Sequence, residues 1–206
     1  MAIEVGTSTD EIKLLLNTLS ALPKGITQAG VRAVNRTGQN VKAEGVRLVR
    51  RDYNVKAGEV RKLLRLLRAS GKDPDNIEAL VLGKGPPGLP MLAFVKGRKK
   101  APSTRRTKGG GYTPKGGISV QVRRDKGKKQ LKGGFIAKMK SGKVGVFKRS
   151  GGKTKDRKKD AIEMKFGPSP IGVLESGRYD QEIEEYSDKM LEKNLRNQVK
   201  QLLAKY

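Results

Sequence analysis

The sequence predicts an α+β protein that has helices at both ends and an antiparallel β-sheet between them. Apolar residues recur with a helical period near both ends of the chain and with a period of two in the middle. Glycine, proline and aspartate punctuate the middle part, as they do in turns. The 206 residues are 35% hydrophobic and 4% aromatic, which suffices for a modest core. We therefore expect residues 1–206 to form a single α+β domain.

Three helices are predicted before the sheet. A lead-in over residues 1–6 precedes the first, which Ser8 and Glu11 begin at the spacing of a capping box and Pro23 ends. Leucine and valine at helical spacing define the other two, and turn residues at 71–75 end the third. The three helices are expected over about residues 9–22, 24–52 and 56–69.

The second helix carries a repeat of glycine at Gly30, Gly38 and Gly45. Each glycine costs up to about 1 kcal/mol of helix propensity relative to alanine. The repeat predicts the close approach of another helix, either in this chain or in a neighbouring subunit. Chance use of glycine explains the spacing equally well.

After the helices the apolar period changes to two, which predicts an antiparallel sheet over about residues 77–166. Pro86-Pro87-Gly88 separates the first two strands, and a polar turn over residues 125–129 precedes the central hairpin. The strands are expected over about residues 77–82, 89–95, 118–122, 135–139, 144–148 and 162–166.

The central stretch over residues 133–149, GGFIAKMKSGKVGVFKR, has the pattern of a β-hairpin. A two-residue Ser-Gly turn at its centre would use the positive φ that glycine allows. Pairing the strands about that turn places Ile136 opposite Phe147 and Met139 opposite Val144. We expect these four side chains to anchor the sheet.

A long helix is predicted at the C-terminal end, over about residues 180–204, after a short helical turn at 171–176. Acidic residues crowd its first turns and lysines its end, an order that suits the helix dipole. Its apolar face is expected to pack on the sheet or to bridge to a neighbouring subunit.

The formal net charge of +26 is concentrated in the middle of the chain. Residues 96–159 carry 24 basic and 2 acidic side chains, whereas the segments on either side are nearly balanced. A block of this kind contacts polyphosphate or an acidic surface, or stays solvated. Its density exceeds what solubility requires.

Two segments of this basic region, residues 96–116 and 150–159, cannot bury enough apolar surface to repay the entropy of ordering. We expect both to be flexible loops that a nucleic acid or an acidic protein orders. The candidate contact residues are Arg98, Lys99, Lys100, Arg105, Arg106, Lys108, Lys115, Lys153, Lys155, Arg157, Lys158 and Lys159.

No pattern indicates an enzyme. The absence of Cys and His removes the usual thiol nucleophile, the commonest general base and the commonest metal ligands. We expect no cofactor and no metal site, because helix capping explains the one carboxylate run, at 182–185. The glycines at 109–111 and 142 lack the spacing of a Walker loop. No apolar run approaches the roughly 20 residues of a membrane span.

Two nucleic-acid-binding classes are compatible with the composition. A helix-turn-helix is disfavoured, because the helix predicted over 24–52 is too long for that motif. A ribosomal-type RNA-binding protein stays open, although only Tyr112 and Phe135 or Phe147 are placed to stack on bases. The residues alone support contact with DNA or RNA through the phosphate backbone, without sequence readout.

Three stretches resemble the phage minor tail protein Z family, the tail-completion proteins of tailed bacteriophages. They are residues 33–37 continuing to 56, the hairpin at 134–149, and residues 162–169, so the resemblance covers most of residues 30–172. The basic segments are more highly charged than the family pattern. The motif residues are Asn35, Arg36, Thr37, Phe135, Ile136, Met139, Gly142, Gly145, Phe147, Gly167 and Pro168.

The resemblance implies a structural virion protein, not an enzyme, assembled in the host cytoplasm and placed at the head-proximal end of the tail, or neck. It implies a homo-hexameric ring around the DNA path, in contact with tail terminator, tail tube or head–tail connector proteins. Our hypothesis is that the basic loops face the lumen and contact double-stranded DNA through its backbone. Alternatively they face outward and clamp acidic tail or connector proteins. The other function left open is an RNA- or DNA-binding assembly factor that acts through these loops.

Overall fold

The computed structural model describes residues 2–5, 25–71, 76–84, 88–97, 117–139, 141–153 and 160–204. The chain is an α+β protein, as predicted, with one long helix toward each end and all but one of the described strands between them. It divides into two compact units. Unit 1 comprises Met1–Val49, Ala57–Gly85 and Ile171–Tyr206, and unit 2 comprises Arg50–Lys56 and Pro86–Pro170.

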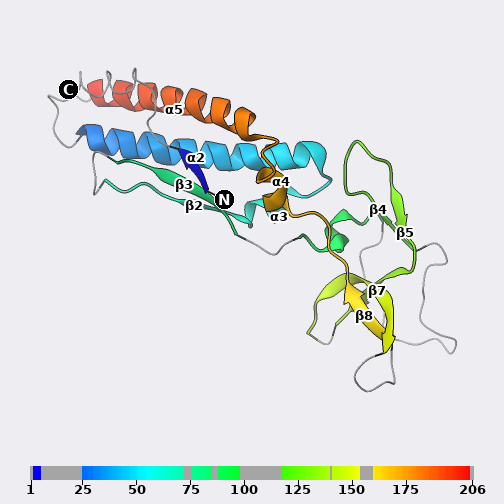
Figure 1. Cartoon of the computed structure of the whole chain (residues 1–206). Coiled ribbons are helices and arrows are strands. Elements are labelled where there is room, and N and C mark those ends of the chain that lie inside the picture. The colour runs from blue at the N-terminus through cyan, green and yellow to red at the C-terminus, as the bar shows by residue number, and fades with distance from the viewer. Residues whose placement is uncertain are drawn as a thin grey trace. The chain divides into compact units, whose positions relative to one another are not determined.

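Unit 1 has three layers, in which one long helix lies between a second helix and a small antiparallel sheet (Figure 1). Its core joins Ala33 and Val34 of the central helix to Ala79 of the sheet and to Leu191 and Leu195 of the outer helix. The helices are α2 (Gly25–Asp52) and α5 (Asp180–Leu203), and the strands, in sheet order, are β1 (Ala2–Val5), β3 (Ala79–Gly83) and β2 (Leu64–Leu67).

Helix α2 exposes only a narrow stripe of its surface, because both neighbouring layers cover the rest. A Cβ atom at Gly38 would lie 2.7 Å from Leu66 Cδ1 and 3.5 Å from Ala79 Cβ. The predicted close approach is therefore real at this glycine, but the partner is the sheet of the same chain and not another helix. Among the residues of α2 whose burial the structure describes, the exposed positions are Gln28, Arg32, Arg36, Gln39, Ala43, Arg47, Arg50 and Arg51.

Two predictions for the N-terminal part are corrected. Residues 2–5 are not a lead-in but an edge strand, paired antiparallel to β3. The helix expected over 56–69 ends at Arg61, as α3 (Ala57–Arg61), and β2 follows. Leu64 is buried and Arg65 exposed, as in a strand with one buried face, and the backbone of this stretch pairs with β3. The helix predicted over 9–22 lies outside the described residues.

The helices predicted over 24–52 and 180–204 correspond to α2 and α5. The short helical turn expected at 171–176 is α4 (Pro170–Leu174). Leu174 of α4 packs within 4 Å of where a Cβ at Gly45 would be, and so does Leu64 of β2. The glycine therefore lets both elements approach α2.

The described part of unit 2 contains two small antiparallel sheets and one 3₁₀ turn. Its core brings together Val95, Ile118, Val120 and Val146, with Ile136 packed against them. The middle of the chain thus holds several small sheets in place of one. The elements are η1 (Met91–Phe94), the pair β4 (Ile118–Val120) and β5 (Lys129–Leu131), and the sheet β6 (Gly134–Lys138), β7 (Val144–Lys153) and β8 (Asp160–Met164).

The strand predicted over 89–95 is wrong, because this stretch forms η1 flanked by isolated β-bridges at Pro90 and Val95. Pro90 has no N–H for a strand ladder. Its carbonyl instead accepts a hydrogen bond from the N–H of Ala93 (2.9 Å), which closes the turn. The strand predicted over 162–166 ends at Met164, and Phe166 forms only a bridge to Pro90.

The central hairpin forms, but its register differs from the prediction by one residue. Ile136 lies opposite Val146, and Phe135 lies opposite Phe147. The N–H of Met139 donates to the carbonyl of Lys143 (2.8 Å), so the connection has three residues and not two. Gly142, at φ 81°, takes the left-handed position that such a loop requires.

Candidate interaction surfaces

The first basic segment is closed at its base by backbone hydrogen bonds of unit 2. The N–H of Lys96 donates to the carbonyl of Ser119 (3.0 Å), and the N–H of Gln121 donates to that of Phe94 (2.9 Å). The chain therefore leaves and re-enters unit 2 at one place. The predicted contact residues Arg98, Lys99, Lys100, Arg105, Arg106, Lys108 and Lys115 lie between these ends, outside the described residues.

The second basic segment is closed in the same way. Strand β7 continues to Lys153, four residues into the expected loop, and the backbone of Lys153 pairs with that of Asp160 at the start of β8. A register irregularity between Arg149 and Lys153 accommodates the extension. The other predicted contact residues of this segment, Lys155, Arg157, Lys158 and Lys159, lie outside the described residues.

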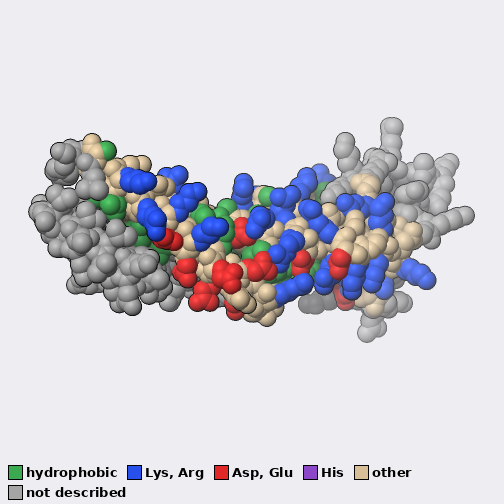
Figure 2. All heavy atoms as spheres, turned by 90° about the horizontal axis from the view of Figure 1, so that it is seen from above, with side chains coloured by type: hydrophobic (Ala, Val, Ile, Leu, Met, Phe, Trp, Pro, Cys, Tyr) green, Lys and Arg blue, Asp and Glu red, His purple; other side chains and the backbone are tan. Residues whose placement is uncertain are grey.

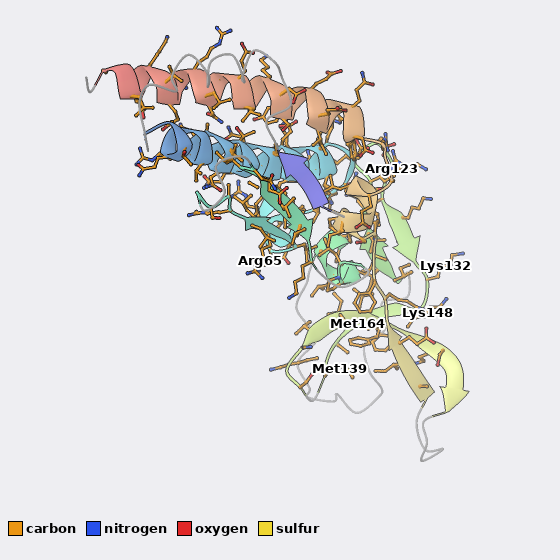
Figure 3. The ribbon with its side chains drawn as sticks, turned by 60° about the vertical axis from the view of Figure 1, so that its left-hand side comes forward. Arg65, Arg123, Lys132, Met139, Lys148 and Met164 are labelled. Carbon is orange, nitrogen blue, oxygen red and sulfur yellow. The ribbon has the colours of Figure 1, made fainter. Side chains whose placement is uncertain are left out.

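The described part of unit 2 presents a further basic surface, which sequence reasoning treated only as a polar turn. The connection between β4 and β5 and the following turn expose five cations. Asp125 is the acidic residue among them, and its carboxylate accepts a hydrogen bond from Arg123 Nε at 2.9 Å. Figure 3 shows Lys132 and Lys148 projecting from this unit. We name the five cations the β4–β5 basic surface: Arg124, Lys126, Lys128, Lys129 and Lys132.

Two carboxylates of unit 2 have pKa values below the ordinary range. The hydrogen bond from Arg123 lowers the pKa of Asp125, with the guanidinium charge adding to the effect. The hydrogen bond from Lys165 lowers the pKa of Glu163 in the same manner. Both pairs are exposed, so they orient side chains at the surface and contribute little to stability.

The motif residues Asn35 and Thr37 have structural contacts inside unit 1. The amide of Asn35 accepts a hydrogen bond from the N–H of Ala69 (2.8 Å) and donates one to its carbonyl (3.1 Å), so it holds the chain that follows β2. Thr37, fully buried, donates to the carbonyl of Ala33 (2.9 Å) and accepts from Asn194 Nδ2 (3.0 Å). Arg36 lies between them on the exposed stripe of α2.

The motif residues of the hairpin divide between its two faces. Ile136 faces the core of unit 2, while Phe135 and Phe147 pair on the other face with ring centroids 6.2 Å apart. Met139 is 40% exposed, so its predicted role as an anchor is wrong. A Cβ at Gly145 would lie 2.9 Å from Met164 Cε and 3.2 Å from Cε2 of Phe147, so both side chains pack closely over this glycine.

The motif pair Gly167-Pro168 packs against η1. The N–H of Gly167 donates to the carbonyl of Leu89 (2.7 Å), and the N–H of Leu89 donates to the carbonyl of Pro168 (3.3 Å). A Cβ at Gly167 would lie 2.8 Å from Cδ2 of Phe94, whose ring is buried. Gly167 and Pro168 therefore serve to pack the chain against η1.

Unit 1 has a basic pocket that no sequence pattern predicted. It has a volume of about 530 Å³ and lies at the outer edge of β2, where Leu64, Leu66 and Gln39 form part of its lining. No carboxylate is among the lining residues that the structure describes. We name it the β2-edge pocket, and its cations are Lys42, Lys62, Arg65, Arg68 and Lys84.

An acidic surface lies elsewhere in unit 1, on the first half of α5. Figure 2, which views the molecule from the α5 side, shows carboxylates gathered there. The prediction that acidic residues crowd the first turns of this helix is confirmed. One of them, Glu185, accepts a hydrogen bond from Gln181 at 2.9 Å. We name the exposed set the α5 acidic face: Asp180, Glu184, Glu185 and Asp188.

The described residues give no sign of a membrane span or of a metal site. Within them, no helix combines the length and the hydropathy that crossing a bilayer demands. The same residues contain no group of three or more carboxylates placed to hold a metal ion.

Comparison with known proteins gives one match. The model of the family described as prophage minor tail protein Z (GPZ) matches residues 12–206, nearly the whole chain. No curated protein and no solved structure matches the chain. The match includes all three stretches on which the resemblance depends, and both units. The chain therefore belongs to the minor tail protein Z family, whose members are structural proteins of bacteriophage tails.

Proposed function

We propose that this protein finishes the head-proximal end of the phage tail and helps to join the tail to the head, as a homo-hexameric ring around the DNA path. Its membership of a family of tail proteins makes it a virion component that contacts other phage structural proteins. A structural protein of this kind has no need of catalytic groups. We also propose that both units act together as one tail-completion domain.

The observation that carries the proposed DNA contact is the concentration of cations in unit 2. The exposed β4–β5 basic surface adds to two basic segments whose ends are fixed by backbone pairing. Six copies would place six such sets of cations at one radius. Lys and Arg that contact phosphates bind DNA without reading its sequence. DNA would thus be held at the neck and could still slide.

The test replaces six cations of the first segment, Arg98, Lys99, Lys100, Arg105, Arg106 and Lys108, with Ser. The variant supplies the protein to a phage that lacks it, and DNA retention at the neck and infectivity are measured. We expect tails that form normally but particles that lose DNA, because the phosphate contacts are weakened. Normal assembly, DNA retention and infectivity would refute the lumen contact.

A control variant in unit 1 replaces three exposed lysines of α5, Lys189, Lys193 and Lys200, with Ser. These belong to unit 1 and should leave DNA retention unchanged. Cross-linking distinguishes the outward alternative: links from Lys99 or Lys108 to tail or connector protein, with none to DNA, would favour a protein clamp. Absence of the protein from the tail end of purified particles would refute the proposed function itself.

A further inference from the structure

We propose that the β2-edge pocket of one copy binds the α5 acidic face of a second copy, so that the chain associates head to tail. The inference rests on the proposed function only for its setting, since the proposed ring is where this contact would operate. Both surfaces belong to unit 1. The contact therefore does not depend on how the two units are arranged.

The pocket collects positive charge without an internal counter-charge. Arg65, Arg68 and Lys84 lie around it with Lys42, and the ion pair of Lys62 to Glu59 is a long one, 3.6 Å, at the surface. Like charges that share a concave surface repel one another, and this repulsion is strongest where solvent is excluded. A partner that carries carboxylates would relieve it.

The position of β2 makes this edge available. The sheet order β1-β3-β2 leaves β2 at one side, and no described strand pairs with its outer edge. Edge strands invite indiscriminate pairing, and cations beside them discourage it. Here the cations of the β2-edge pocket would repel a basic chain and admit an acidic one, which gives selectivity for charge.

The α5 acidic face matches the pocket in charge and in length. Six of the thirteen residues from Asp180 to Glu192 are acidic, in a chain whose net charge is +26. At about 1.5 Å per residue, Asp180 and Asp188 are roughly 12 Å apart along the helix. Leu64 and Leu67, at the two ends of β2, are roughly 10 Å apart at about 3.3 Å per residue.

The two surfaces lie on opposite outer layers of unit 1. The α5 layer and the sheet are separated by α2 (Figure 1), and Arg65 projects from β2 on the side away from α5 (Figure 3). One copy cannot bring its own surfaces together, so the contact must be between copies. A head-to-tail contact of this kind closes into a ring when the rotation per copy allows it.

DNA is the less favoured occupant of this pocket. Leu64 and Leu66 form part of the lining, and a phosphate backbone offers little apolar surface to cover them. A helix of a second copy brings aliphatic side-chain carbons beside its carboxylates. Helix α5 of another copy is present wherever copies of the chain assemble.

The test uses complementary charge reversal in the full-length protein. One variant carries Arg65→Glu and Arg68→Glu, and the other carries Glu184→Lys and Glu185→Lys. All four side chains are exposed, so both variants should fold, as circular dichroism would verify. Self-association is measured by sedimentation velocity after nuclease treatment, at low and high salt.

We expect the wild-type chain to self-associate more weakly at high salt, and each variant alone to associate at least tenfold more weakly. A mixture of the two variants should regain association, since an acidic pocket then meets a basic helix face, and the reverse. The control variant Lys138→Glu with Lys143→Glu, at exposed positions beside the hairpin turn of unit 2, should associate as the wild type does.

Three outcomes would overturn the contact: variants that associate normally, a mixture that regains nothing, or a wild-type chain that stays monomeric. Loss of binding to a DNA duplex by the pocket variant, with self-association intact, would assign the pocket to DNA instead. None of these results bears on whether the protein lies at the tail end of the particle. The proposed function is therefore tested separately, by the experiment given for it above.

Discussion

The buried hydrogen bond between Thr37 and Asn194 joins the two long helices of unit 1, and its removal gives a quantitative test of their packing. Thr37→Val keeps the shape of the side chain and removes the hydroxyl. Asn194, 4% exposed, would keep its amide without the acceptor that it now has. An unsatisfied buried donor costs about 1–3 kcal/mol, which we expect as the loss in free energy of unfolding.

Removing the other partner of this hydrogen bond, in Asn194→Leu, should lower the free energy of unfolding less through the loss of the bond. In Asn194→Leu, the hydroxyl of Thr37 still donates to the carbonyl of Ala33, so no buried donor loses its partner there. The double variant should therefore be nearly as stable as Asn194→Leu alone. The coupling free energy between the two positions is expected to be on the order of 1 kcal/mol.

The assay is urea unfolding followed by far-ultraviolet circular dichroism, at one fixed protein concentration. Gln198→Ala is the control, since it removes an amide whose hydrogen bond to Gln201 (3.3 Å) is at the surface. That control should stay within about 0.5 kcal/mol of the wild type. A Thr37→Val variant as stable as the wild type, or strictly additive losses in the double variant, would refute the reasoning.

Two further predictions concern unit 2. Gly167→Ala should lower the free energy of unfolding by about 1–3 kcal/mol, because its Cβ would overlap the buried ring of Phe94; Gly127→Ala, with nothing within 4 Å, is the control and should be nearly neutral. Equal stability of the two alanine variants would contradict this packing. Arg123→Gln should raise the pKa of Asp125 toward its ordinary value, as followed by carboxyl NMR, because the side-chain hydrogen bond that lowers it is lost. Since the folded-state pKa of Asp125 is the lower one, its small stabilising effect is present above the unfolded pKa and is lost as the pH falls through the folded pKa; an unchanged titration in the variant would count against the pair.

Helices with one clear period could be predicted, whereas segments compatible with two periods could not. The helix over 24–52 agrees with α2 to within a residue, because its apolar stripes fit only the helical period. The leucines at 63, 64, 66 and 67 fit a helix and a strand alike. Backbone pairing with β3, which lies further along the chain, makes Leu64–Leu67 a strand. The local sequence does not show that this pairing will form.

Neither the register of the central hairpin nor the β2-edge pocket could be predicted from local sequence. Whether two or three residues connect β6 and β7 decides the register, and Ser-Gly is compatible with both. The cations of the pocket come from α2, from the α3–β2 stretch and from the end of β3. Only the fold brings them together, so charge counting along the chain could not find them. The contact residues of the two basic segments stay a prediction.

The closed bases of the basic segments have a consequence for how such a protein can diverge. Closure entropy of a chain segment grows slowly, by about 0.6 kcal/mol for each doubling in length. Because backbone hydrogen bonds at Lys96 and Ser119 already fix the ends, residues could be inserted or deleted between Gly97 and Gly117 without disturbing the sheet. The length and sequence of the segment can therefore vary independently of the sheet. The charge of the segment could therefore change as the protein diverges, while the sheet that closes its base keeps its packing.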